Sequence, residues 1–167
     1  MSIAAALLPE FDHEMAGFRR VLERIPQDAM EFRPHPKSFT LGGLGNHLAT
    51  IPGWAVTTMT TTELDFADPA NRAKMPPPCT TVAALLDTFD TGVVQARAAL
   101  AEATDAALME VWSGKSDGQV LFSFPRIGVL RSFILNHGIH HRGQATVYLR
   151  MLNVPVPALY GPTADEG

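Results

Sequence analysis

Cysteine and charge are both scarce in this sequence, and each scarcity limits what the protein can be. Cys79 is the single cysteine among 167 residues, so neither an intrachain disulfide framework nor a multi-cysteine zinc site can form. We interpret Cys79 as an ordinary loop thiol. Charged residues make up 18% of the chain, below the roughly 25% usual in globular domains, which favours a surface partly covered by a partner subunit.

Basic clusters and long apolar runs are also missing. The chain has 13 basic and 17 acidic residues, a net charge of −4, and its arginines form no stripe, so we expect no nucleic-acid binding. No apolar run approaches the ~20 residues that a membrane span needs. The opening "MSIAAALLPEFDHE" has no basic leader and reaches acidic residues too early for a secretory signal. These absences predict a cytoplasmic protein.

Apolar residues at helical spacing are abundant and mark four long segments of the chain. Thr40 is a plausible N-cap of the second segment, and Thr80 or Thr81 of the third. Four one-sided helices of this length predict an all-α protein, a four-helix bundle formed by a single domain over residues 1–167. The predicted helices cover residues 2–24, 41–62, 81–103 and 125–152.

Prolines and glycines separate these segments and interrupt one of them. Pro52 falls inside the second helix and predicts a kink or a break there. The polar, proline-rich stretch "DFADPANRAKMPPPC" is too long for a tight turn, so we interpret it as a crossing connection between helices. Alternating apolar residues at 119–124, after a glycine-containing turn, predict a short extended insertion.

Three histidines within five positions of the fourth helix indicate the chemistry of the protein. His137 and His141 are one helical turn apart and share a face, so both imidazoles can approach one cation, while His140 lies at the edge of that face. No glutamate stands between the pair, which excludes the H-E-x-x-H metalloprotease pattern. His47, in the middle of an apolar face of the second helix, is the best candidate for a third ligand.

Each of these residues also has an ordinary structural interpretation. A single histidine on a helix is more often a hydrogen-bonded or partly exposed residue than a metal ligand, and we assign that structural role to His13 and His35. Trp54 and Tyr148 lie seven residues after His47 and His141, hence on the same helix faces. Either aromatic side chain could line a pocket or pack in the core; core packing is favoured for Tyr148, and the choice stays open for Trp54.

Two stretches of the sequence resemble the motifs of one protein family. "FRPHPKSFTLGGLGNHLATIPGW" and "NHGIHHRGQATVYLRMLNVPVP" resemble the N-terminal and C-terminal signatures of the DinB-like (DinB/YfiT-like) superfamily. The resemblance implies a four-helix bundle, usually homodimeric, that holds a divalent metal ion through His47, His137 and His141. His140 and Arg142 occupy motif positions that are not usually ligands.

The reaction is less defined than the metal site. Three neutral imidazoles leave a divalent ion its full charge and an open coordination position, as in catalytic sites. The resemblance implies transferases and isomerases that use bacillithiol, mycothiol or another small thiol, and also hydrolases. We therefore expect a thiol-dependent S-transferase, with a metal-dependent hydrolase or a non-catalytic, metal-stabilised binding module as alternatives. Zinc, nickel, iron and copper all suit three imidazoles.

Overall fold

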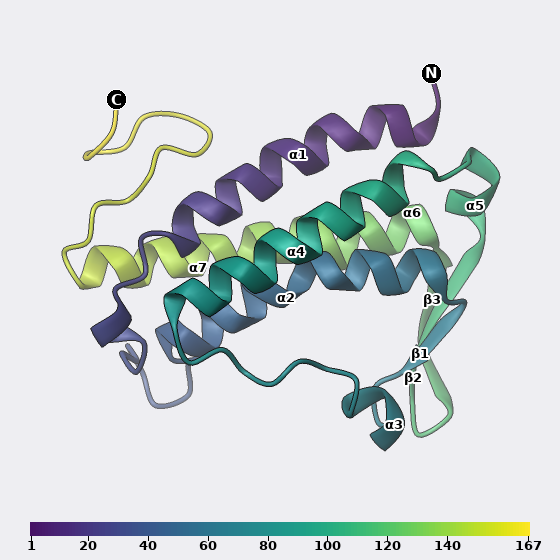
Figure 1. The fold of residues 1–167 in the computed structure, drawn as a ribbon, viewed down its shortest axis with the longest axis horizontal. Helices are drawn as coiled ribbons and strands as arrows, with labels where there is room; N and C mark the ends of the chain where they lie inside the picture. Colours follow the sequence, from purple (N-terminus) through teal and green to yellow (C-terminus); the bar gives the residue numbers. More distant parts are fainter.

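Four long helices form the body of the protein. The computed structural model describes all 167 residues, and in it the four helices run side by side (Figure 1). The second helix continues without a break through Pro52. Side chains cap the N-termini as expected: Thr40 accepts a hydrogen bond from the backbone of Gly43, and Thr81 accepts one from Ala84. The helices are α1 (Ile3–Leu22), α2 (Leu41–Thr60), α4 (Val82–Ala101) and α7 (His137–Met151).

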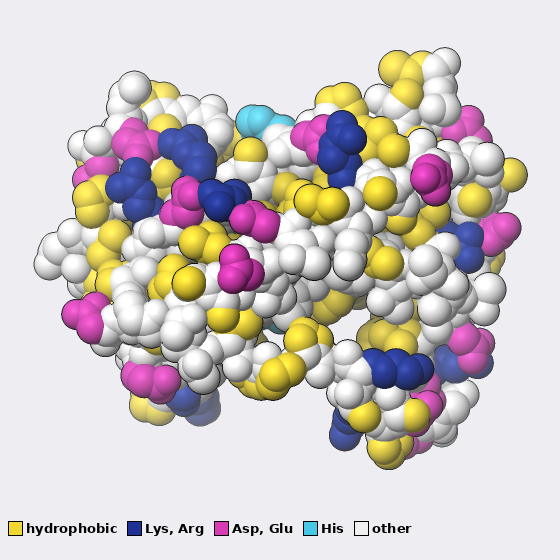
Figure 2. All heavy atoms as spheres, in the orientation of Figure 1, with side chains coloured by type: hydrophobic (Ala, Val, Ile, Leu, Met, Phe, Trp, Pro, Cys, Tyr) yellow, Lys and Arg dark blue, Asp and Glu magenta, His cyan; other side chains and the backbone are white.

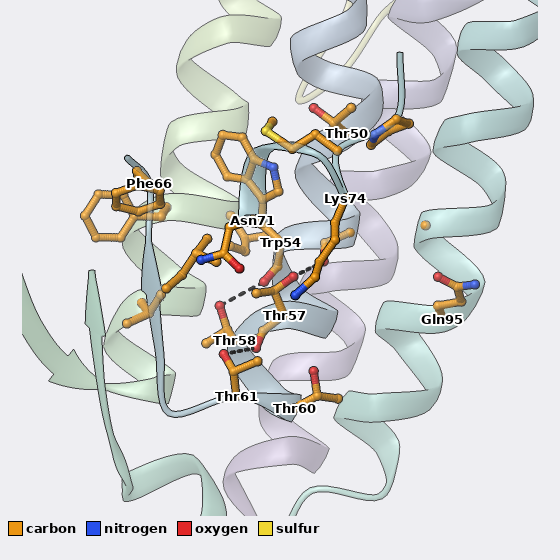
Figure 3. A pocket seen from close by; sticks show the side chains of 18 of the residues that line it. Thr50, Trp54, Thr57, Thr58, Thr60, Thr61, Phe66, Asn71, Lys74 and Gln95 are labelled. Carbon is orange, nitrogen blue, oxygen red and sulfur yellow. Dashed lines mark hydrogen bonds between the residues drawn. The ribbon is translucent and has the colours of Figure 1, made fainter. Parts of the chain in front are cut away.

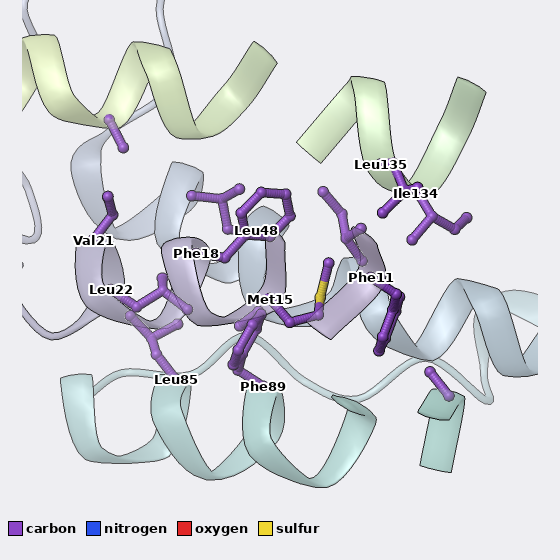
Figure 4. Close-up of a cluster of buried hydrophobic side chains, with 14 of the residues drawn as sticks. Phe11, Met15, Phe18, Val21, Leu22, Leu48, Leu85, Phe89, Ile134 and Leu135 are labelled. Atoms are coloured by element: carbon purple, nitrogen blue, oxygen red, sulfur yellow. The ribbon is translucent and has the colours of Figure 1, made fainter. Parts of the chain in front are cut away.

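The apolar faces of these helices meet in one core. Aromatic and aliphatic side chains from α1 lie between those of α4 on one side and those of the last helical stretch on the other (Figure 4). Phe11, Met15, Phe18 and Leu22, which follow one another at helical spacing on α1, are all buried. Burial of this apolar surface, and not helix propensity alone, holds the helices together. The fully buried large side chains in Figure 4 are Phe11, Phe18, Leu22, Leu48, Leu85 and Phe89.

Close contact between α1 and α7 depends on one glycine. A Cβ atom at Gly138 would lie 2.3 Å from the ring of Phe18, a distance at which the two helices could not keep their present spacing. Gly138 directly follows His137. The glycine thus allows the helix that carries the histidines to pack closely against the core, directly beside His137.

The helix predicted over residues 125–152 runs in one direction, but it is not α-helical throughout. It consists of α6 (Arg126–Val129), a π-helical segment η2 (Leu130–Asn136), and α7. In an α-helix each step of four residues drifts by about 40° around the axis, and the wider turns of a π-helix offset that drift. Leu130, Ile134 and Gly138, at successive steps of four, are therefore all buried.

A small sheet corrects the all-α prediction. Its strands are ordered β1-β2-β3, with β1 (Glu63–Asp65) parallel to β2 (Val111–Ser116) and β2 antiparallel to β3 (Gln119–Pro125). The extended insertion expected at 119–124 is the last of these strands. The other two strands were not predicted: β1 has only three residues and pairs with a strand distant in sequence, and β2 is polar except at Val111 and Trp112 and so has no alternating apolar pattern.

The sheet lies at one end of the helices, beside the crossing connection (Figure 1). The β2–β3 hairpin turns at Asp117 and Gly118, both with positive φ, as in the two-residue hairpins that Asp-Gly favours. The crossing connection contains α3 (Pro69–Arg72) and runs below α2 and α4 in the view of Figure 1, from α3 to the start of α4. Two further short helices are η1 (Gln27–Ala29) and α5 (Asp105–Met109). No helix has both the length and the apolar character needed to span a membrane.

Candidate metal centre

Three histidines from two helices meet where α2 packs against α7. His47 comes from the middle of α2, His137 is the first residue of α7, and His141 follows one turn later. One nitrogen atom from each ring can be chosen so that all three lie within 4.8 Å of one another. The structure thus brings together the three residues that the helical spacing singled out. No carboxylate or thiol belongs to this cluster.

The geometry of the three rings suits a tetrahedral ion. The Nε2 atoms of His47 and His137 are 2.8 Å apart, where one ring donates a hydrogen bond to the other. Zinc–nitrogen bonds of 2.0–2.1 Å in a tetrahedron require about 3.3 Å between ligand nitrogens, so His47 and His137 need to separate by only about half an ångström. The His141 nitrogen lies within 4.8 Å of both. Three imidazoles with this spacing can hold a divalent transition-metal ion and leave one coordination position without a protein ligand.

Two residues that the sequence analysis missed orient the imidazoles. Nδ1 of His141 lies 2.7 Å from Oε1 of Gln144, and a hydrogen bond donated by the ring there leaves Nε2 free to coordinate a metal. The ring of Phe39 stacks on His47, with centroids 6.0 Å apart, and meets His141 edge-on. Gln144 follows His141 by three residues on the same helix, and this spacing alone could have predicted the contact between them.

The environment of His47 and His137 favours the neutral imidazole, which is the form that binds metal. Burial, together with the nearby His141 and His137, lowers the pKa of His47 to about 4. Burial also lowers the pKa of His137, with contributions from His141 and His140. Protons therefore compete little with a cation for His47 and His137 at neutral pH.

The metal-free protein should lose stability as the pH falls. Because the pKa of His47 is lower in the folded than in the unfolded chain, the unfolded state takes up protons first, below about pH 6.5. The free energy of unfolding should thus be greatest above about pH 6.5 and decrease between about pH 6.5 and 4. Urea denaturation of metal-free protein across that range tests this. A His47→Gln variant should show a shallower pH dependence, and an unchanged slope would contradict the assignment.

The other candidate residues named from the sequence lie in different parts of the structure. Trp54 contacts the site: its ring centroid is 5.4 Å from that of His47 and 5.7 Å from that of His137. Tyr148 is buried in the core and its hydroxyl donates to the carbonyl of Phe39, so it takes the structural role favoured from the sequence. The ring of His140 lies beside that of His141 but outside the cluster.

Cys79 is also outside the cluster, in the segment that leads to α4. Its backbone is held to α2 by Asn46, the neighbour of His47, through one hydrogen bond donated and one accepted by the asparagine amide. Its sulfur lies 3.3 Å from the hydroxyl of Thr88. These contacts agree with a structural role for the thiol.

The fold and the three-histidine cluster together define a helical protein with a candidate metal site. Comparison with known proteins shows to which family it belongs. A model of the DinB family matches residues 1–167, and the chain belongs to that family. The resemblance seen in the two sequence motifs is thereby confirmed.

Individual relatives agree with this placement. The uncharacterized protein YrdA of Bacillus subtilis strain 168 is 26% identical over 161 residues, which cover 95% of this chain and 89% of YrdA. Two crystal structures of DinB-like proteins share the fold, each with a TM-score of 0.70 over 95% of this chain. One, from Bacillus cereus ATCC 10987, is 22% identical and covered over 98% of its length; the other, YjoA of Bacillus subtilis, is 16% identical and covered over 99%.

Proposed function

We propose that this protein is a metal-dependent enzyme that transfers a small thiol to an organic electrophile: the thiol sulfur forms a bond to carbon, the thiol loses its proton and the electrophile loses its leaving group. The observation that carries the proposal is the composition of the cluster: three neutral imidazoles and no fourth protein ligand. A structural zinc site is normally closed by four protein ligands, whereas a catalytic site keeps one position for water or substrate. In this proposal the family's four-helix bundle provides the scaffold, and the ion is zinc, nickel or iron.

The charge of the site supports a thiol as one substrate. A divalent ion held only by neutral ligands retains its double charge, and it would favour the ionised, nucleophilic form of a thiol bound there. His47 and His137 supply the neutral nitrogens, and Gln144 fixes the orientation of the His141 ring. Trp54 covers one side of the imidazoles and excludes water from that side.

Cobalt substitution tests the thiol directly. Adding bacillithiol, mycothiol or glutathione to the cobalt protein should produce an intense near-ultraviolet charge-transfer band, because sulfur then coordinates the ion. The Cys79→Ser variant is the matched control: it removes the protein's own thiol and should give the same band. If none of the three thiols changes the cobalt spectrum at millimolar concentration, thiol transfer is rejected and metal-dependent hydrolysis becomes the leading function.

We also propose that the protein forms a twofold dimer, the commonest form of oligomer. The low fraction of charged residues supports this, as do large apolar side chains exposed on the outer surface of the helices: Val94 on α4, and Val147 and Met151 on α7. Light scattering should give twice the mass of the chain at micromolar concentration. A monomer mass would contradict the proposal.

A further inference from the structure

A deep cleft lies next to the histidine cluster and is not formed by the histidines themselves. Its volume is about 1320 Å³, enough for a small organic molecule. Residues of α2 and α4 form its floor, and the crossing connection forms its roof. The space-filling view shows the hollow between the helices and the lobe that contains α3 (Figure 2). Aromatic and aliphatic residues close the end near the sheet: Leu64, Phe66, Phe122, Val129, Phe133 and Ile134.

Trp54 links this cleft to the candidate metal centre. Its indole lines the cleft and also contacts the rings of His47 and His137. Thr50, one turn before Trp54 on α2, lines the cleft as well, and its hydroxyl donates to the carbonyl of His47. A molecule in the cleft would therefore lie one side chain away from the imidazoles.

The α2 wall of the cleft has many hydroxyl groups but no free hydroxyl hydrogens. Each threonine has one hydroxyl hydrogen, and each threonine on this wall donates it to a carbonyl of its own helix. The wall therefore offers methyl groups and acceptor oxygens, and it cannot donate hydrogen bonds to an anion. The pairs are Thr50 to His47 (3.0 Å), Thr57 to Gly53 (3.4 Å), Thr58 to Trp54 (2.9 Å), Thr60 to Val56 (2.8 Å) and Thr61 to Thr57 (2.8 Å).

The roof supplies the charge that the α2 wall lacks. Lys74 extends from the crossing connection into the cleft, toward the threonines of α2 (Figure 3), and its ammonium group has no hydrogen-bond or ion-pair partner in the structure. Asp65, also at the cleft, already accepts backbone hydrogen bonds from Ala67, Asp117 and Gly118. Arg72 also lines the cleft, but its Nε donates to the carbonyl of Phe66, and Asp87 adds a second carboxylate. Lys74 is thus the cation of the cleft whose charged group has no partner.

The far end of the cleft suits an apolar body. The rings of Phe122 and Phe133 stack with centroids 4.5 Å apart, and Phe66 lies 6.4 Å from Phe122. Phe66 is 44% exposed, a large fraction for a phenylalanine in a globular protein. A flat or aliphatic group in the cleft would cover part of this aromatic surface and gain the corresponding apolar burial.

We propose that the cleft binds the second substrate, and that this substrate is an elongated organic anion with an apolar body. Its acid group contacts Lys74, its body lies against the aromatic residues, and its reactive end lies beside Trp54, the cleft residue that contacts His47 and His137. The role as electrophile rests on the proposed function, but binding in the cleft requires neither metal nor thiol. The two proposals can therefore fail independently.

Calorimetric titration with 4-phenylbutyrate tests the cleft in both metal-loaded and metal-free protein. We expect the acid to bind more tightly than the neutral 4-phenylbutanamide, and acetate to bind far more weakly because it has no apolar body. The Lys74→Met variant keeps the apolar stem and removes the charge. It should weaken binding of the acid about tenfold, as expected for a hydrogen bond to a charged group, and leave the amide unchanged.

Two further variants separate charge from apolar contact. Lys37→Met removes an exposed lysine that does not line this cleft and should change nothing. Phe133→Ala should weaken the binding of the acid and of the amide to the same extent. Equal affinity for acid and amide in the unmodified protein, an equal effect of the two lysine variants, or no binding of 4-phenylbutyrate at millimolar concentration would each overturn the proposal. Binding of the acid at Lys74 together with an unchanged cobalt spectrum would reject thiol transfer alone.

Discussion

Replacing His47 with alanine should remove most of the metal that the purified protein retains after dialysis. The three imidazoles act as one ligand set, and a borderline ion is held much less well by two neutral nitrogens than by three. His137→Ala and His141→Ala should have the same effect. The loss should exceed the roughly 10- to 100-fold decrease in affinity that follows removal of an outer hydrogen-bond partner.

Elemental analysis of a matched set of variants measures this. His140→Ala removes an imidazole next to His141 that does not belong to the cluster, and His13→Ala removes one that stacks on Tyr160 and does not belong to it either. Both should retain metal. Gln144→Ala should give an intermediate loss, because it frees the orientation of His141 without removing a ligand. Full metal retention in His47→Ala would break the assignment of the site.

Replacing Arg142 with methionine should destabilise the protein by about 3–5 kcal/mol, the usual cost of leaving a buried charge unpaired. Arg142 forms an ion pair of 2.9 Å with Glu14, and the two side chains are only 2% and 7% exposed. The hydroxyl of Tyr160 donates to Glu14 and accepts from Arg142, which ties the C-terminal segment to the same pair. The midpoint of thermal unfolding should fall by about 10 °C.

A surface ion pair provides the control for this prediction. Arg19 contacts Asp90 through two hydrogen bonds, but both side chains are more than 40% exposed. Arg19→Met should therefore cost at most about 1 kcal/mol. The double variant Glu14→Gln, Arg142→Met should recover part of the lost stability, since no unpaired charge then remains buried. Equal destabilisation by the Arg19 and Arg142 variants in calorimetry would contradict this account.

The candidate site could be predicted from the sequence because the spacing of its histidines along the helices is visible there. His137 and His141 share a helix face at any position of the helix in space, and His47 stands on a face whose other residues are apolar. The family motifs then linked the two helices. Gln144 was within reach of the same reasoning, but Phe39 was not: it precedes α2 in a loop, and only the folded loop brings it onto His47.

The cleft could not be found from the sequence. Lys74 belongs to a polar, proline-rich connection with no periodicity, and its position above the threonines of α2 depends on the path of that connection across the helices. The parallel pairing of β1 with β2 joins residues about fifty positions apart, a contact that no local pattern encodes. The aromatic end of the cleft depends on this pairing.

By itself the sequence determined the four helices, their buried faces and the histidines that lie on two of them, because helical periodicity and side-chain chemistry are local properties. Only the tertiary structure decided how those faces are turned toward one another. The π-helical segment η2 ends at Asn136, immediately before His137, so its wider turns set the direction in which the first imidazole of α7 points. Such a segment is maintained by packing against the neighbouring helices, and local sequence alone does not specify it.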